Sequence, residues 1–243
     1  KAAWIYVGPI NDGGWTQSHD AGRKAVETAL GSKVVTTYKE NISDSGNEAA
    51  TLIEDLVKDG NNIIFATSFG YGEAMIAAAK KHPDVKFMHA TGAWHNTTPN
   101  FATYYGATEE AKYLAGIAAA YRTASSKIGF VVSFPIPEVL TQVNAFTLGV
   151  RSVKPEATVE VTWTNSWYDP VAAKSAGLEL VNTGCDVICA YLDTMNAQIA
   201  AAEKGAYAIG CSSPAPAVLP DAYLTAPIFN WANYYTKDVQ KII

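Results

Sequence analysis

The sequence of 243 residues lacks the signals of several large functional classes. It has no apolar run near the roughly 20 residues that span a bilayer, and its first segment, KAAWIYVGP, has no charged region followed by an apolar leader. Lys and Arg are nowhere concentrated and the formal net charge is −5, which argues against nucleic acid or an anionic membrane as a partner. With 49% hydrophobic residues, the chain is expected to form a soluble, globular protein with a substantial core.

Cysteine is scarce, with three residues at positions 185, 189 and 211. An odd number cannot all pair, and the segment CDVIC does not have the CxxC spacing of metal and redox sites. Within one strand, Cys185 and Cys189 would lie about 13 Å apart, too far for a disulfide. The sequence therefore predicts buried free thiols and leaves the cellular compartment open.

Catalytic motifs are also absent. The sequence has no GxSxG, no HExxH, no GxxxxGK phosphate loop and no GxGxxG after its first strand-like run. The four histidines, His19, His82, His89 and His95, do not stand at metal-ligand spacings. His82 is expected at the end of a helix, and His89 as a core residue of a strand. Two facing carboxylates such as Asp12 and Asp193 are capable of acid–base chemistry, but nothing in the sequence selects that option, and no metal or cofactor is expected.

Short β-branched and aromatic runs alternate with segments of helical spacing along the whole chain. The expected strands lie within 3–9, 32–38, 61–68, 85–91, 127–134, 158–165, 186–193 and 206–213, and the expected helices within 21–30, 49–57, 74–81, 139–150, 172–181 and 197–204. Apolar strands joined by helices require a parallel sheet covered on both faces, so the sequence predicts a doubly wound α/β fold.

Cap residues support two of these helices. Asp44 or Ser45 is expected to cap the second helix and Gly60 to end it. Asp169, followed by Pro170, is expected to begin a later helix that closes near Gly184. The pattern of four strands occurs twice, before about residue 103 and after residue 127, which indicates two α/β halves with a cleft between them.

Aromatic and polar residues gather directly after the expected strands. Ligands of open α/β sheets bind beyond the carboxyl ends of the strands, so these residues are the candidate site: Asp12, Trp15, Ser68, Phe69, Tyr71, Thr91, Gly92, Trp167, Tyr168 and Asp193. Large aromatic side chains are uncommon in turns, where small and polar residues are preferred. A flat, planar ligand would account for the aromatic residues that follow these strands.

Each candidate also has a structural interpretation. Trp15 fits a hydrophobic staple of the following helix, and Trp167 fits a cap on the sheet. Asp12 fits a turn residue, and for Asp169 a helix cap is the better interpretation. Asp193 either caps the next helix or accepts a hydrogen bond from a ligand N–H, and the sequence leaves both open.

Several long segments together resemble the basic membrane protein family of substrate-binding proteins for ABC transporters, which includes purine-nucleoside receptors. They include GPINDGGWTQSHDAGRKAVE, IIFATSFGYGEAM, EEAKYLAGIAAA, IGFVVSFPIPEVLTQVNAFTLGVRSV and NSWYDPVAAKSAGLELVNTGCDVI. The resemblance implies a type I periplasmic-binding fold, with an N-terminal domain of residues 1–105 plus 231–243, a C-terminal domain of residues 106–230, and hinge crossings near 103–108 and 227–232. It also implies a monomer outside the cytoplasm, exported with a signal peptide that is then removed, and a membrane permease as partner.

The resemblance further implies a purine ligand stacked on the aromatic residue of the first turn. In DGGWTQS that residue aligns with Trp15, the family's acidic residue with Asp12 and its asparagine with Thr16. A ring from the other domain, Tyr168 or Trp167, is expected to complete the stack. Asp193 is expected to accept from an N–H of the base, Ser68 or Asn230 to complete the polar edge, and Trp231 to be a further ligand-binding residue.

Two departures from the family matter. Thr91 stands at or near the place of an aspartate that binds ribose, which favours a free base such as adenine over a nucleoside. The chain also stops at NYYTKDVQKII, inside a helix expected to return to the first domain, so part of the cleft wall is expected to lie beyond it. The alternatives are a nucleoside hydrolase that uses cleft carboxylates, a ligand-sensing regulator of the same fold, and a receptor for another small planar or polar solute.

Overall fold

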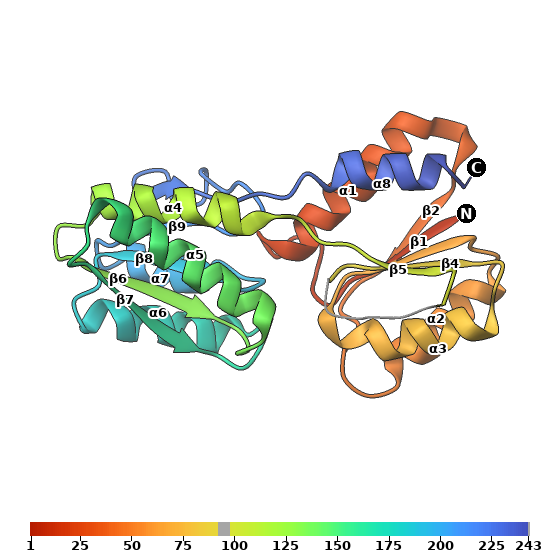
Figure 1. Ribbon diagram of the computed structural model, residues 1–243, viewed down its shortest axis with the longest axis horizontal. Helices are drawn as coiled ribbons and strands as arrows, with labels where there is room; N and C mark the ends of the chain where they lie inside the picture. The colour runs from red at the N-terminus through yellow and green to blue at the C-terminus, as the bar shows by residue number, and fades with distance from the viewer. Residues whose placement is uncertain (92–97, 243) are drawn as a thin grey trace. The chain divides into compact units, whose positions relative to one another are not determined.

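The computed structural model describes residues 1–91 and 98–242, and the chain divides into two compact units (Figure 1). Unit 1 comprises Lys1–Ile10, Thr16–Gly106 and Asn230–Ile243, and unit 2 comprises Asn11–Trp15 and Ala107–Phe229. The chain passes from one unit to the other after Ile10, Trp15, Gly106 and Phe229. Each unit holds one five-stranded parallel sheet with helices on both faces, which confirms the predicted α/β class.

The sheet of unit 1 has the strand order β2-β1-β3-β4-β5, and every neighbouring pair is parallel. Its central strands are apolar and fully enclosed, as a sheet covered on both faces requires. The strands are β1 (Ala2–Ile5), β2 (Thr36–Lys39), β3 (Ile63–Ala66), β4 (Lys86–His89) and β5 (Phe101–Thr103).

Two pairs of helices cover this sheet (Figure 1). Helices α1 (Trp15–Leu30) and α8 (Trp231–Gln240) lie on one face, and α2 (Glu48–Lys58) and α3 (Gly72–Lys81) lie on the other. Aliphatic side chains fill the α2–α3 side, whereas rings fill the α1–α8 side, where Trp4 stacks on Phe65 at 4.7 Å and Tyr235 of α8 packs on both. Burial of these large rings supplies much of the apolar area that stabilises unit 1.

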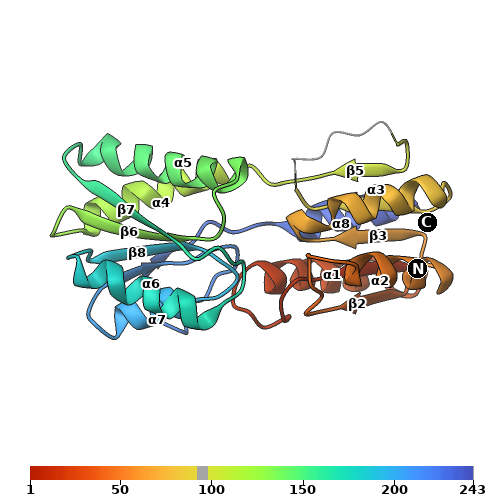
Figure 2. The same ribbon diagram turned by 90° about the horizontal axis from the view of Figure 1, so that it is seen from below.

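The sheet of unit 2 has the order β10-β9-β8-β6-β7, again with every pair parallel. Helices α4 and α5 cover one face, and α6 and α7 cover the other (Figure 2). The elements are β6 (Lys127–Val132), β7 (Thr158–Trp163), β8 (Val187–Tyr191), β9 (Tyr207–Ile209), β10 (Tyr223–Thr225), α4 (Thr108–Arg122), α5 (Pro137–Val153), α6 (Pro170–Asn182) and α7 (Asn196–Ala202).

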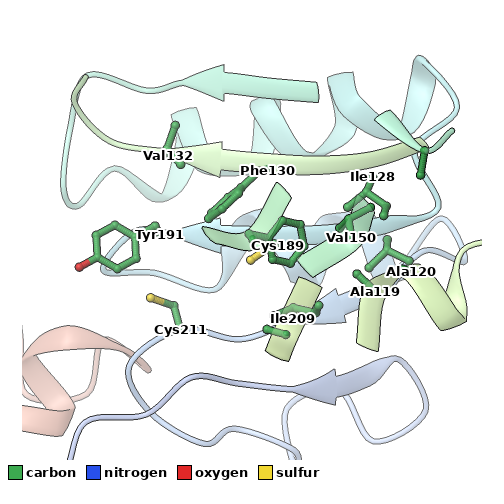
Figure 3. Packing of buried hydrophobic residues seen from close by; sticks show 14 of the residues in the cluster. Ala119, Ala120, Ile128, Phe130, Val132, Val150, Cys189, Tyr191, Ile209 and Cys211 are labelled. Atoms are coloured by element: carbon green, nitrogen blue, oxygen red, sulfur yellow. The ribbon is translucent and has the colours of Figure 1, made fainter. Parts of the chain in front are cut away.

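Helices α4 and α5 approach closely because each presents a glycine to the other. A Cβ on Gly116 would meet the Phe146 carbonyl oxygen at 2.1 Å, and one on Gly149 would meet that of Tyr113 at 2.0 Å. The core beneath this pair joins Phe130, Cys189 and Ile209, with Tyr191 and Cys211 at one end of the cluster (Figure 3). Helices α4 and α5 thus enclose this core on one face of the unit 2 sheet.

The helix ends test the sequence interpretation residue by residue. Asp169 caps α6 by accepting from the backbone N–H of Val171 and Ala172, which confirms its structural role. Gly60 and Gly184 follow helices with φ of +80° and +98°, as expected for terminating glycines.

Three details differ from the sequence predictions. Asn47, not Asp44 or Ser45, occupies the cap position of α2, because the Asp44 side chain instead contacts Ser68 and Gly70. Helix α1 begins at Trp15, six residues before the predicted start at Ala21. Each sheet has five strands where four were predicted, because β5 and β10 have only three residues each.

The cysteines and two of the histidines lie as predicted. All three thiols are free and buried. His82 is the C-cap residue of α3 and contacts Glu54 at 3.0 Å. His89 is fully buried in β4, and burial lowers its pKa to about 4. Within 1–91 and 98–242, no helix is both long and apolar enough to cross a membrane.

Candidate functional site

The segment between β1 and α1 packs at the carboxyl edge of the unit 2 sheet. Gly13 has φ +79°, and the Asp12 carboxylate accepts from the backbone N–H of Gly14 at 2.8 Å. The Gly14 carbonyl in turn accepts from the Ser213 hydroxyl at 2.8 Å. Gly14 also lies in van der Waals contact with backbone atoms of Leu192, Asp193 and Cys211. The part Asn11–Trp15 is therefore held by the loops that follow β8 and β9 of unit 2.

Asp12 and Asp193 both lie near Gly14 at this edge, since Asp12 accepts from the Gly14 N–H and a Cβ on Gly14 would lie 3.8 Å from the Asp193 Cα. Both are buried, with exposed fractions of 9% and 6%. Burial raises the pKa of the Cys211 thiol above its ordinary value. Lys112 and the Ser212 hydroxyl lower this pKa, and the Asp193 and Asp12 carboxylates raise it by smaller amounts. Two buried carboxylates near one position supply acceptors for the N–H groups of a small molecule.

Asp193 does not hold the cap position of the next helix. Met195 occupies the N-cap position of α7, and no side chain caps that helix. The backbone N–H of Asp193 donates to the Trp167 carbonyl at 2.9 Å, which joins the loops that follow β7 and β8. Of the two roles left open by the sequence, the cap of α7 is therefore not the one that Asp193 takes.

Trp15 lies in the same unit, at the first position of α1. Its ring meets that of Phe229 edge to face, with centroids 5.3 Å apart and planes at 82°. The exposed fraction of Trp15 is 9%, so the indole is nearly enclosed. Asp12, Trp15 and Asp193 are therefore three candidate residues that the structure places in one unit.

The two aromatic residues after β7 differ from each other. Trp167 is half-buried and packs on the unit 2 core, with its ring 5.4 Å from that of Phe134. Tyr168 is 41% exposed. Trp167 thus has a packing role whether or not it also contacts a ligand, whereas Tyr168 projects a ring toward solvent.

The candidates of unit 1 follow β3 and β4. The Ser68 hydroxyl donates to the Asp44 carboxylate at 2.5 Å, and the Ser68 carbonyl accepts from Nε2 of His89 at 2.7 Å. Burial keeps His89 neutral, which suits it to this donor role. The backbone N–H of Thr91 donates to the His89 carbonyl at 2.9 Å, and Thr91 is buried. Ser68, Thr91 and the half-buried Phe69 thus share the carboxyl edge of the unit 1 sheet.

Three other candidates have structural positions. Tyr71 is fully buried in the α2–α3 core, and its hydroxyl donates to the Ile42 carbonyl at 2.6 Å. Asn230 caps α8 by accepting from the backbone N–H of Asn233. Trp231 is enclosed in unit 1, where it stacks on His19 at 4.4 Å and donates to the Ser18 hydroxyl. Gly92 lies outside the described residues.

Sequence reasoning missed several residues that shape these edges. Asp44 holds Ser68, Ser213 holds Gly14, and Phe229 meets the ring of Trp15. Only Ser213 carried a signal, since it ends a predicted strand segment. The other two lie outside the positions directly after strands, and their partners are distant in the chain.

A hollow elsewhere in unit 1 is distinct from both edges. It has a volume of about 320 Å³ and lies beside Ile63 and Lys86, the first residues of β3 and β4, with Asp238 of α8 also in its wall. Ligands of parallel sheets bind at the carboxyl ends of strands, so this hollow at the amino ends is not the candidate site. Across 1–91 and 98–242, no group of three or more His, Cys, Asp or Glu residues is placed to hold a metal ion.

Comparisons with known proteins agree with the fold and the resemblance. The chain is 39% identical over its full length to a purine-binding protein of Brucella abortus (strain 2308), of which it covers 69%. It is also 39% identical, over 242 residues, to a Haloferax volcanii protein provisionally named an ABC transporter glucose-binding protein, of which it covers 61%. A solute-binding protein of an ABC transporter system from Aeropyrum pernix K1 has the same fold, with a TM-score of 0.89 at 18% identity over 99% of this chain and 70% of that one.

The family model of PnrA-like ABC transporter substrate-binding proteins matches residues 1–243. The match covers every described element of both units, and it confirms the resemblance carried by the sequence segments quoted above. The chain therefore belongs to the family of PnrA-like ABC transporter substrate-binding proteins.

Proposed function

We propose that this chain is the solute receptor of an ABC importer and that its ligand is a purine base, with adenine preferred over a nucleoside. One observation carries the proposal: Asp12, Trp15 and Asp193 belong to one unit, and Gly14, between the first two, contacts the loops that follow β8 and β9. A flat ring beside two buried carboxylates suits a planar heterocycle whose edge carries N–H groups.

Trp15 is the proposed stacking residue. Stacking of a base on an aromatic ring contributes about 1–3 kcal/mol, and a nearly enclosed indole loses little freedom when a ligand binds. The edge-to-face contact with Phe229 holds the indole in one orientation. Tyr168 is the proposed second ring, with Trp167 as the support beneath it.

The polar edge of the base is proposed to meet Asp12 and Asp193. The Asp12 carboxylate accepts from the Gly14 N–H, and a carboxylate accepts more than one hydrogen bond. Ser68 and Asn230 are proposed as additional polar contacts from unit 1. The preference for adenine rests on Thr91, which offers a hydroxyl where the resemblance implies a carboxylate for ribose.

A sugar is the second candidate ligand. The Haloferax volcanii relative, as similar in sequence as the Brucella abortus one, carries glucose in its name. A tryptophan and two carboxylates also suit a sugar, because carboxylates accept hydrogen bonds from hydroxyl groups. A purine ring is flat and a sugar ring is not. Loss of the Trp15 indole should therefore weaken purine binding more than sugar binding.

The rest of the proposal concerns the transport cycle. The two units are proposed to be domains that close over the ligand, with hinge crossings near 103–108 and 227–232. The partner is proposed to be a membrane permease, reached outside the cytoplasm by a monomeric receptor that binds no nucleic acid. The protein is proposed to bind without catalysis, so incubation with adenosine should leave the nucleoside intact when followed by chromatography.

The direct test is to denature the purified protein and identify released small molecules by mass spectrometry, since binding proteins often retain their ligand. A purine in the extract supports the proposal. A hexose in place of a purine contradicts it and selects the second candidate.

A further inference from the structure

Unit 2 also contains Lys112, which is not among the residues proposed above to bind the ligand. It lies on α4, and its side chain has no exposed surface. Lysine is almost never fully buried unless it is paired, because removal of an ammonium group from water is costly. The buried Lys112 ammonium group is therefore expected to have partners that offset this cost.

The partners of Lys112 in the protein are weak ones. Its Nζ lies 3.9 Å from the Cys189 sulfur, and it lies over the rings of Phe130 and Tyr191 at 5.4 and 5.5 Å from their centroids. Sulfur is a poor acceptor, and ring faces attract a cation without accepting a directed hydrogen bond from each N–H. Among residues 1–91 and 98–242, no carboxylate forms an ion pair with Lys112.

Its neighbours place this ammonium toward the carboxyl edge of the sheet. Tyr191 is the last residue of β8 and lies two positions before Asp193. Cys211 lies two positions beyond the end of β9. Burial raises the pKa of its thiol, Lys112 lowers it, and the Asp193 and Asp12 carboxylates raise it. Tyr191 and Cys211 lie together at one end of the core cluster in Figure 3. The buried cation and the two buried carboxylates thus belong to one region of unit 2.

We propose that Lys112 is a ligand-binding residue, whose ammonium group donates a hydrogen bond to an acceptor atom of the bound solute. This inference rests on the proposed function and adds to it: Asp12 and Asp193 accept hydrogen bonds, whereas Lys112 donates one. The solute then carries both N–H or O–H groups and an acceptor, such as a ring nitrogen or carbonyl oxygen of a purine. A binding site that retains an unsatisfied charge does so at a cost in stability.

The test replaces Lys112 with methionine, which keeps the length of the side chain and removes the charge. Wild type and Lys112→Met are freed of ligand by unfolding and refolding, and adenine, hypoxanthine and D-glucose are titrated into each by calorimetry. For the compound that binds wild type most tightly, Lys112→Met is expected to bind at least about tenfold more weakly. The ligand-free variant is expected to unfold at the same temperature as wild type or a higher one.

The matched control is Cys189→Ala, which disturbs the same cluster and keeps the ammonium group. It is expected to bind the same compound within about twofold of wild type. Equal affinity of Lys112→Met and wild type overturns the inference. So does a ligand-free Lys112→Met that is less stable than wild type, since the protein itself then satisfies the charge. Tightest binding of glucose overturns the purine proposal instead, and Lys112 is then judged by its effect on glucose affinity.

Discussion

The hydroxyl of Ser213 donates a hydrogen bond to the backbone carbonyl of Gly14, 2.8 Å away, and so joins two residues that lie 199 positions apart in the chain. Both belong to unit 2, although Gly14 follows a strand of unit 1. The bond is buried, and it fixes the segment that carries Asp12 and Trp15. Three predictions concern this segment and unit 2, and a fourth concerns His89 of unit 1.

Ser213→Ala should loosen this segment. A buried carbonyl that loses its donor costs about 1–3 kcal/mol, so the free energy of unfolding should fall by that order, and adenine affinity should fall with it. Chemical denaturation and calorimetry measure the two effects. Ser175→Ala is the control, because the exposed Ser175 hydroxyl bonds only within its own helix. Equal effects of the two variants on affinity would remove Ser213 from this role.

Trp15→Ala should weaken purine binding at least about tenfold, because it removes the proposed stacking ring. Trp15→Phe keeps a flat ring and should retain most of the affinity. Calorimetry with adenine gives both values, and circular dichroism verifies the fold. Unchanged affinity of Trp15→Ala would place the indole outside the site.

Substitution of Asp169 should change the stability of the protein, whereas substitution of Asp193 should change its affinity for adenine. Asp169→Ala removes the cap of α6 and should lower the free energy of unfolding by about 1 kcal/mol with no change in adenine affinity. Asp193→Asn should weaken adenine binding while α7, which has no side-chain cap, stays intact. The account is wrong about Asp193 if the two variants exchange these effects.

The stability of unit 1 should depend on pH through His89. Burial lowers the folded-state pKa of His89 to about 4 from an ordinary 6.5. Between these two pKa values the unfolded chain binds a proton at His89 that the folded chain does not bind. The contribution of neutral His89 to the free energy of unfolding is therefore complete above pH 6.5 and is lost as the pH falls toward 4.

The loss is of the order of 3 kcal/mol at pH 4. His89→Gln keeps a side-chain N–H to donate to the Ser68 carbonyl and removes the titration, so its stability should fall less over this pH range. Urea denaturation at several pH values compares the two proteins. Parallel pH profiles would show that His89 does not carry the effect.

The alternation of apolar strands and helices was sufficient to predict the fold class, because parallel sheets require that pattern. Local detail was less accessible. The sequence near Asp44 has the form of a helix cap, but the carboxylate contacts Ser68, 24 positions away, and a local pattern does not record such a partner. The start of α1 was missed because Asp20 is polar but buried in an ion pair with Arg23 of the same helix.

The site divides in the same way. Positions directly after strands follow from topology, which made Asp12, Trp15 and Asp193 candidates. The resemblance placed Asp12 and Trp15 in the N-terminal domain, whereas the structure assigns Asn11–Trp15 to unit 2. Which way a ring points was not predictable, since Tyr71 and Trp231 are core residues although each stands beside a strand end or a crossing. The burial of Lys112 was not predictable from the sequence, because a lysine on a helix is normally solvated.

The central claim is that the edge of unit 2 around Trp15 binds a free planar base. Calorimetric titration of the ligand-free protein with adenine, adenosine and D-glucose tests it most directly. The account predicts that adenine binds most tightly, adenosine more weakly and glucose not measurably. Tighter binding of adenosine would contradict the role given to Thr91, and binding of glucose without either purine would contradict the claim itself.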